Sequence, residues 1–380
     1  MNPNRSEARL HFYWLDALRG IAALSVLLWH YNHFYFATPD LGFVDPAGFT
    51  HHPFYSVFWL FYEYGLYAVQ FFWLLSGFVF AHTYFNRPTG NREFLIARFA
   101  RLYPLHFLTL VIVAVMQFVS FNTLGRATLF ENTDLYHYVL QIFLVSGWGF
   151  ENGNSFNVPI WSVSAEIAVY LIFLFLLSKA FFRELWGQLA IVVLTYVLTV
   201  GLDALRIDFW DHKIVLQCAT YFFVGIVVYS MLERFDGKSA LPVLIAIGVL
   251  AFGIFGLYRQ ALSMDFLLTF GASLYLIACL DKIGVPGGRF FSPVAAITYT
   301  VYLVHVPTQI AIVLMLDNWG IDRSIADSNW FFLSYNGFVI AMSAILYRHY
   351  ERPLDKAIRR YGKTYLANRD NARTLPIAAE

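Results

Sequence analysis

The sequence has little charge and almost no cysteine. Only 13% of its 380 residues are Asp, Glu, Lys or Arg and 59% are hydrophobic, whereas about a quarter of an ordinary soluble domain is charged. This composition excludes a soluble enzyme and an intrinsically disordered chain. The formal net charge of +1 gives no basic excess of the kind that binds nucleic acid, so we expect no nucleic-acid partner.

The two cysteines, Cys218 and Cys279, both fall inside apolar runs. They support neither a disulfide framework nor a thiolate metal site, and we expect no bound metal. The chain also lacks an obvious 20–50-residue repeat, a low-complexity linker and a separate soluble domain. Aromatic residues are abundant at 19%, which suits membrane interfaces and platforms on which sugars stack.

Long apolar runs dominate the sequence. About 20 mostly apolar residues cross the roughly 30 Å of bilayer hydrocarbon, and ten runs qualify: 15–36, 57–80, 104–121, 162–178, 188–204, 214–231, 241–258, 264–280, 294–315 and 331–347. A further stretch, 136–148, is too short and precedes the loop-like FENGNSFNVP. The predicted fold class is an all-α integral membrane protein with about ten transmembrane helices and one short re-entrant or interfacial helix.

The distribution of basic residues orients these spans. With the N-terminus inside, 21 of the 26 lysines and arginines fall on the cytoplasmic side, as the positive-inside rule requires. We therefore predict that both termini are cytoplasmic, that residues 1–352 form one polytopic membrane domain, and that 353–380 form a basic cytoplasmic tail. The basic segment 348–366 has apolar residues at helical spacing, and we expect it to lie on the anionic inner leaflet.

The first span carries Asp16, Arg19 and His30. A charged group inside a span costs about 2.5–3.5 kcal/mol on insertion scales, so each one is a functional hypothesis. Arg19 and His30 are eleven residues apart, which puts them on one helix face about 16 Å apart. His30 could accept a proton from a hydroxyl nucleophile or simply bond a neighbouring helix. Arg19 could equally be an anchor paired with Asp16.

Two further segments contain candidate binding residues. Ser76 and Gly77 interrupt the bulky FFWLLSGFVFAHTY, where small residues permit close helix packing. Arg98 and Arg101 in the loop NREFLIARFARLYP share one helix face. Paired guanidiniums suit bidentate binding of phosphate, but these two also fit an ordinary cytoplasmic loop.

Polar groups recur near the fourth and ninth spans. In NVPIWSVSAEIAVY, Glu166 follows Trp161 a few residues into the fourth span from its outer end, where a carboxylate needs a polar partner or ligand. Tyr302 and His305 occupy one stripe of the ninth span. They indicate either a substrate site or a polar seam between helices.

These segments together resemble the acyltransferase-3 family of integral-membrane acyltransferases. The resemblance rests on LDALRGIAALSVLLWH, FFWLLSGF, RFARLYP, WSVSAEIAVY, YTVYLVH and YERP, which occur in the family's order and extend from residue 15 to about 353. It implies that His30 is catalytic, that Arg19 supports it, and that Arg98 and Arg101 belong to the acyl-donor side. The hydrolase-like domain that some members carry at the C-terminus is absent, so we expect the stand-alone form.

The resemblance also implies the reaction. The expected donor is cytosolic acyl-CoA, acetyl-CoA or succinyl-CoA, used as a co-substrate with no permanently bound cofactor. The expected acceptor is a hydroxyl of an extracytoplasmic glycan, and the expected location is the bacterial inner membrane. Polysaccharide modification such as O-acetylation is one such reaction.

We assign the candidate residues accordingly, with catalytic roles for His30, Arg19 and Glu166, donor-binding roles for Arg98, Arg101 and Ser76, and acceptor-binding roles for Trp161, Tyr302, His305 and Asp16. His30 would act as a general base or as an acyl-carrying nucleophile. The competing class is a transporter or flippase of a glycan or small anion, which would need an internal pseudo-repeat or paired broken helices that the sequence does not show. An acyltransferase with a phospholipid donor is a further alternative.

Overall fold

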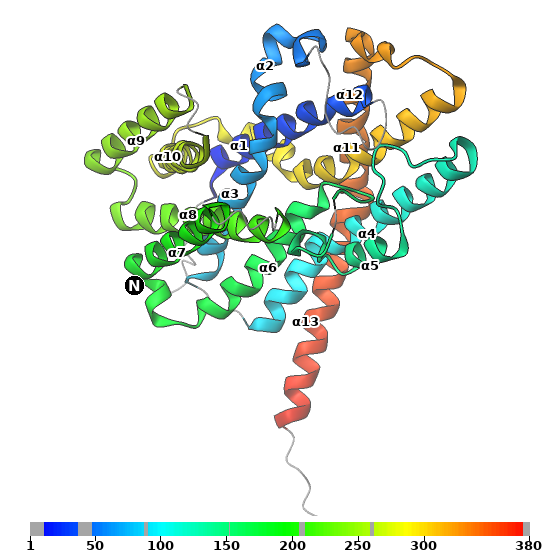
Figure 1. Ribbon diagram of the computed structural model, residues 1–380. Helices are drawn as coiled ribbons and strands as arrows, with labels where there is room; N and C mark the ends of the chain where they lie inside the picture. The colour runs from blue at the N-terminus through cyan, green and yellow to red at the C-terminus, as the bar shows by residue number, and fades with distance from the viewer. Residues whose placement is uncertain are drawn as a thin grey trace, which may run out of the picture.

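The computed structural model describes residues 11–36, 48–86, 90–151, 153–204, 210–258 and 262–374. These residues form an assembly of helices (Figure 1), and the one β contact among them is an isolated bridge between Asn132 and Ser155. The helices are α1 (Tyr13–Trp29), α2 (Tyr55–Tyr64), α3 (Ala68–Tyr84), α4 (Asn91–Leu124), α5 (Leu135–Ile142), α6 (Ile160–Leu177), α7 (Leu185–Ala204), α8 (Trp210–Phe235), α9 (Ala240–Tyr258), α10 (Leu262–Lys282), α11 (Ser292–Trp319), α12 (Asn329–Leu346) and α13 (Arg352–Thr374). The predicted all-α class is confirmed.

Every predicted apolar run contains a helix, and the stretch 136–148 folds as the short α5 followed by a 3₁₀ turn. Within the described residues, seven helical segments are long and apolar enough to cross a membrane: Tyr55–Tyr84, Asn91–Leu124, Ile160–Leu177, Leu185–Leu202, Lys213–Phe235, Gly288–Trp319 and Asn329–Asn368. The count of ten spans and the cytoplasmic position of both termini stay predictions.

The centre of the bundle depends on a close approach between α3 and α8. A Cβ added at Gly77 of α3 would overlap the backbone carbonyl of Phe222, and one added at Gly225 of α8 would overlap that of Leu74. Small residues at such a crossing let two helix backbones meet. The packing interpretation of the small residues in FFWLLSGF therefore agrees with the structure at Gly77.

This crossing gives a stability prediction. We expect Gly77→Ala to destabilise the protein by about 1–3 kcal/mol or more, because α3 must move away from a backbone atom that cannot rotate aside. The measurement is the melting temperature of the purified protein in detergent. The matched control is Gly248→Ala on α9, where an added Cβ meets no atom within 4 Å. Equal melting temperatures for the two variants would contradict the packing argument.

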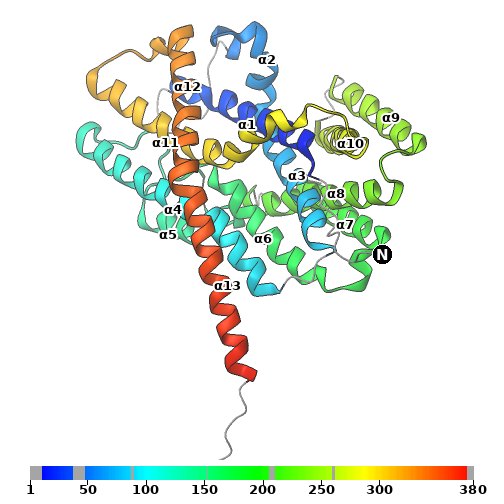
Figure 2. The same ribbon diagram turned by 180° about the vertical axis from the view of Figure 1, so that it is seen from behind.

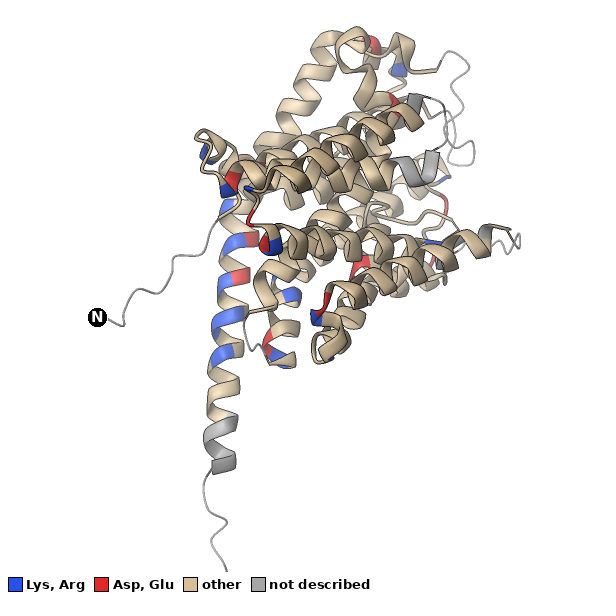
Figure 3. Cartoon of the chain, turned by 90° about the vertical axis from the view of Figure 1, so that its left-hand side faces the viewer, with Lys and Arg blue, Asp and Glu red and all other residues tan. Residues whose placement is uncertain are grey.

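The C-terminal helices form one continuous rod. A π-helical turn, Tyr347–Glu351, joins α12 to α13 without a break in helical structure, and α13 then extends away from the other helices (Figures 1 and 2). Figure 3 shows several Lys and Arg positions along this helix, in blue. The segment continues α12, and its first turns pack on α4. Its position on the inner leaflet stays a prediction.

Candidate active site

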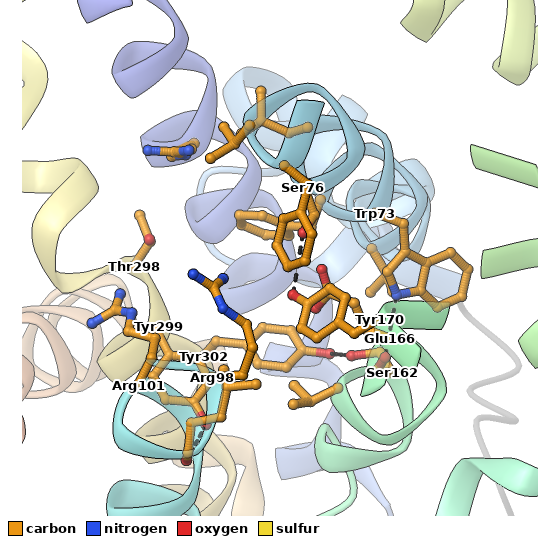
Figure 4. Close-up of a pocket in the computed structure, with 18 of the residues that line it drawn as sticks. Trp73, Ser76, Arg98, Arg101, Ser162, Glu166, Tyr170, Thr298, Tyr299 and Tyr302 are labelled. Carbon is orange, nitrogen blue, oxygen red and sulfur yellow. Dashed lines mark hydrogen bonds between the residues drawn. The ribbon is translucent and has the colours of Figure 1, made fainter. Parts of the chain in front are cut away.

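A cavity of about 400 Å³ lies among α1, α3, α4, α6, α11 and α13 (Figure 4), within the size range of small-molecule sites. Its polar lining residues are Arg19, Ser76, Arg98, Arg101, Ser162, Glu166, Tyr170, Thr298, Tyr299, Tyr302 and Arg359. Six of the ten residues singled out from the sequence are thus brought together: Arg19, Ser76, Arg98, Arg101, Glu166 and Tyr302. The other four, Asp16, His30, Trp161 and His305, do not line it.

Arg101 is fixed at the cavity wall by a buried carboxylate. Its guanidinium pairs with Glu351 of the π-helical turn, and the second carboxylate oxygen accepts a hydrogen bond from Thr300. The same guanidinium stacks over the ring of Tyr299, 5.4 Å from its centroid. Glu351 was not predicted from the sequence, although it is the acidic residue of YERP. The extra residue in a π turn is a frequent feature of functional sites.

Arg98 lies deeper among aromatic rings. Its guanidinium carbon is 4.7 Å from the centroid of Phe80 and one terminal nitrogen donates to the hydroxyl of Tyr84 at 3.2 Å. Its Nε is buried and has no hydrogen-bond partner in the described part of the chain. A buried N–H without a partner is costly, so this donor is suited to an anionic ligand.

Arg19 and Asp16 form the predicted i,i+3 pair, with 3.2 Å between Nη1 and Oδ1. Asp16 also accepts a hydrogen bond from Ser292 at 3.0 Å and lies 2.9 Å from His11 Nε2. Asp16 therefore orients Arg19 and does not itself line the cavity. Its predicted contact with the substrate stays a prediction.

Glu166 occupies a different position from the one expected. We expected it near the outer end of its span, but it lines the same cavity as Arg98, which we assigned to the donor, and interacts with Ser76 and Tyr170 (Figure 4). The reason is that α6 begins inside the bundle. Asn157, just before α6, donates to Thr109 near the middle of α4 and to the backbone oxygen of Leu303 in α11.

His30 is buried in a cluster of three imidazoles at the end of α1. Its ring centroid is 4.7 Å from that of His305 and 5.0 Å from that of His33. His30 Nδ1 is 2.8 Å from the carbonyl oxygen of Val26. A carbonyl only accepts, so Nδ1 carries the proton and Nε2 keeps its lone pair. His30 is thus held in the tautomer that a base or nucleophile needs.

The neighbouring groups support this arrangement. Gln309 donates to the backbone oxygen of His30 at 2.7 Å, and its side-chain oxygen lies 2.8 Å from His33 Nδ1. Neither His33 nor Gln309 was predicted from the sequence. Their spacing could have indicated them, because each lies one helical turn beyond a predicted histidine, in HYNH and HVPTQ. The described residues contain no group of three or more His, Cys, Asp or Glu that could hold a metal ion.

Tyr302 lies between the cavity and the histidine cluster. Its hydroxyl is 2.6 Å from Ser162 Oγ and 3.0 Å from the Pro159 carbonyl, and its ring centroid is 6.0 Å from that of His305. Trp161 packs edge-to-face against Trp73, a cavity residue, at 5.7 Å. The arginine-lined cavity therefore ends one aromatic side chain away from the histidines.

The chain matches the acyltransferase domain family over residues 12–348. It belongs to the acyltransferase-3 family and is a multi-pass membrane acyltransferase. It is 31% identical over 179 residues to "Protein 2 in picA locus" of Rhizobium radiobacter, covering 43% of this chain and 80% of that protein. It is 37% identical over 127 residues to "Acyltransferase MdmB" of Streptomyces mycarofaciens, where the match spans about a third of either protein, 32% of each. No solved structure matches.

Proposed function

We propose that this protein transfers an acyl group, acetyl or succinyl, from cytosolic acyl-CoA to a hydroxyl of an extracytoplasmic glycan at the bacterial inner membrane. The observation that carries the proposal is a single cavity that has arginines at one end and, at the other, Tyr302 in contact with the histidine cluster. An anionic thioester donor needs both ends, because its phosphates and its reacting carbon lie at opposite ends of the molecule.

The arginine end suits the donor's phosphates. The side chains of Arg19 and Arg101 line the cavity and remain 30% and 33% accessible although each is held by a carboxylate, so part of each guanidinium is free to contact a ligand. Arg98 adds its unpaired Nε. A guanidinium that is hydrogen-bonded along one edge and has free N–H groups along the other is preorganised for bidentate contact with phosphate.

The histidine end supplies the chemistry. The Nε2 lone pair of His30 accepts the proton of the acceptor hydroxyl. At the same time the hydroxyl oxygen attacks the carbonyl carbon of the thioester. The carbon–sulfur bond then breaks, and the departing thiolate takes the proton from the imidazolium. The products are the acyl ester and coenzyme A, with no net change in protons on the enzyme. Tyr302 must shift for the thioester to reach the imidazole.

A hydroxyl-rich acceptor is supported by polar atoms around His30. Nε2 of His305, whose ring centroid is 4.7 Å from that of His30, is buried without a hydrogen-bond partner in the described part of the chain, and so are both amide atoms of Asn32, two residues after His30. Buried polar groups are nearly always paired, so unpaired ones beside a reactive group indicate a polar ligand. A sugar offers several hydroxyls in one small volume.

Inside-out membrane vesicles test the proposal. With radiolabelled acetyl-CoA added to the exposed cytoplasmic face, we expect label in the carbohydrate fraction, and none when right-side-out vesicles receive the same donor. Label confined to the lipid fraction would contradict the glycan acceptor. Purified protein separates the two roles of His30, since a stoichiometric burst of thiol release without acceptor indicates an acyl-histidine and its absence indicates a general base.

A further inference from the structure

The helix α13 contributes one arginine to the cavity from outside the family motifs. From the π-helical turn into α13, the inward positions Glu351, Asp355, Arg359 and Gly362 follow one another at helical spacing. Gly362 is buried, and a Cβ added there would come within 2.7 Å of Ile96 in α4. This face of α13 therefore lies on the first turns of α4, and among the described side chains of α13 Arg359 is the basic one that lines the cavity.

Arg359 is oriented by its neighbours. Its Nε donates to Asp355 at 2.8 Å and its Nη2 donates to the backbone oxygen of Ala97 at 3.0 Å. Within the described residues Nη1 makes no hydrogen bond, and 36% of the side chain is exposed. The guanidinium is thus held on one edge and open on the other, as Arg101 is.

The position of Arg359 relative to Arg101 indicates two separate anion sites. Ala97 precedes Arg101 by one turn of α4, so the two guanidiniums are anchored about 6 Å apart along that helix. Arg359 belongs to the helix that leaves the bundle, whereas Ser162 and Tyr302 at the other end of the cavity are buried. We therefore place Arg359 at the mouth of the cavity, Arg98 and Arg101 further in, and Tyr302 at the inner end.

Coenzyme A carries phosphate in two places, the ribose 3′-phosphate and the 5′-diphosphate that joins the pantetheine arm. With the thioester beyond Tyr302 and the diphosphate at Arg98 and Arg101, the ribose lies at the mouth. We propose, resting on the proposed acyl-CoA donor, that Arg359 binds the 3′-phosphate and that α13 thereby selects coenzyme A over its 3′-dephospho form.

The test is the affinity of the purified full-length protein for coenzyme A and for 3′-dephospho-coenzyme A, measured by calorimetry. We expect Arg359→Ala to weaken binding of coenzyme A about tenfold or more, as loss of a charge-assisted hydrogen bond does. Binding of the dephospho form should not change. Arg360→Ala removes the same charge from the neighbouring, exposed position and should change neither affinity.

Arg359→Gln controls for a folding defect, because glutamine still offers an N–H to the Ala97 carbonyl. It should also weaken binding of coenzyme A and leave binding of the dephospho form unchanged. Equal weakening of both ligands by Arg359→Ala would overturn the assignment to the 3′-phosphate, as would no weakening of either. A wild-type protein that binds neither ligand would instead overturn the proposed donor itself, so the two failures are distinguishable.

Discussion

Replacing His30 with alanine is expected to lower the rate of acyl transfer at least a hundredfold, because a positioned general base contributes about 10²–10⁴ in rate. The affinity for acyl-CoA should change little, since His30 does not line the arginine-rich cavity. The measurement is thiol release from acetyl-CoA by purified protein with acceptor present, together with donor binding by calorimetry.

The matched control for this variant is His106→Ala. His106 is also buried and also bonds a backbone carbonyl, that of Gln141, but it lies outside both the cavity and the histidine cluster. We expect this control to transfer acyl groups at a rate near that of the wild type. Retention of full transfer by His30→Ala would show that the catalytic assignment is wrong.

Replacing Arg98 and Arg101 together with alanine is expected to raise the KM for acyl-CoA about a hundredfold or more. Hydrogen bonds to charged groups contribute about 1.5–3 kcal/mol each, and the double variant removes two guanidiniums from the cavity wall. The KM for the acceptor should not change, because the arginines and the histidine cluster lie at opposite ends of the site. Steady-state kinetics with each substrate varied in turn measures both constants.

Arg92→Ala is the control for this pair. Arg92 is an exposed residue on the first turn of the same helix and does not line the cavity, so its loss alters local charge without altering the site. An unchanged donor KM in the double variant would mean that Arg98 and Arg101 do not bind the donor. Raised salt should weaken donor binding in the wild type more than in the double variant, since salt screens charge pairs.

Several parts of the site could be predicted from local patterns. The i,i+3 spacing of Asp16 and Arg19 gave their ion pair. The apolar runs gave the helices, because hydrophobic length is a property of a contiguous segment. His33 and Gln309 were not predicted, although each lies one helical turn from a predicted histidine. The position of Glu166 could not be predicted from the sequence, because the boundary of an apolar run does not show that a helix begins inside the bundle.

The sequence by itself determined an all-helical membrane acyltransferase and six of the residues that line its cavity. Only the tertiary structure decided that Glu351 holds Arg101 across 250 residues, that His305 and Gln309 meet the end of α1, and that α13 brings Arg359 to the cavity mouth. The physical reason is the range of the interactions. Hydrophobicity and helical spacing act within one segment, whereas these contacts follow from which helices pack together and at what depth.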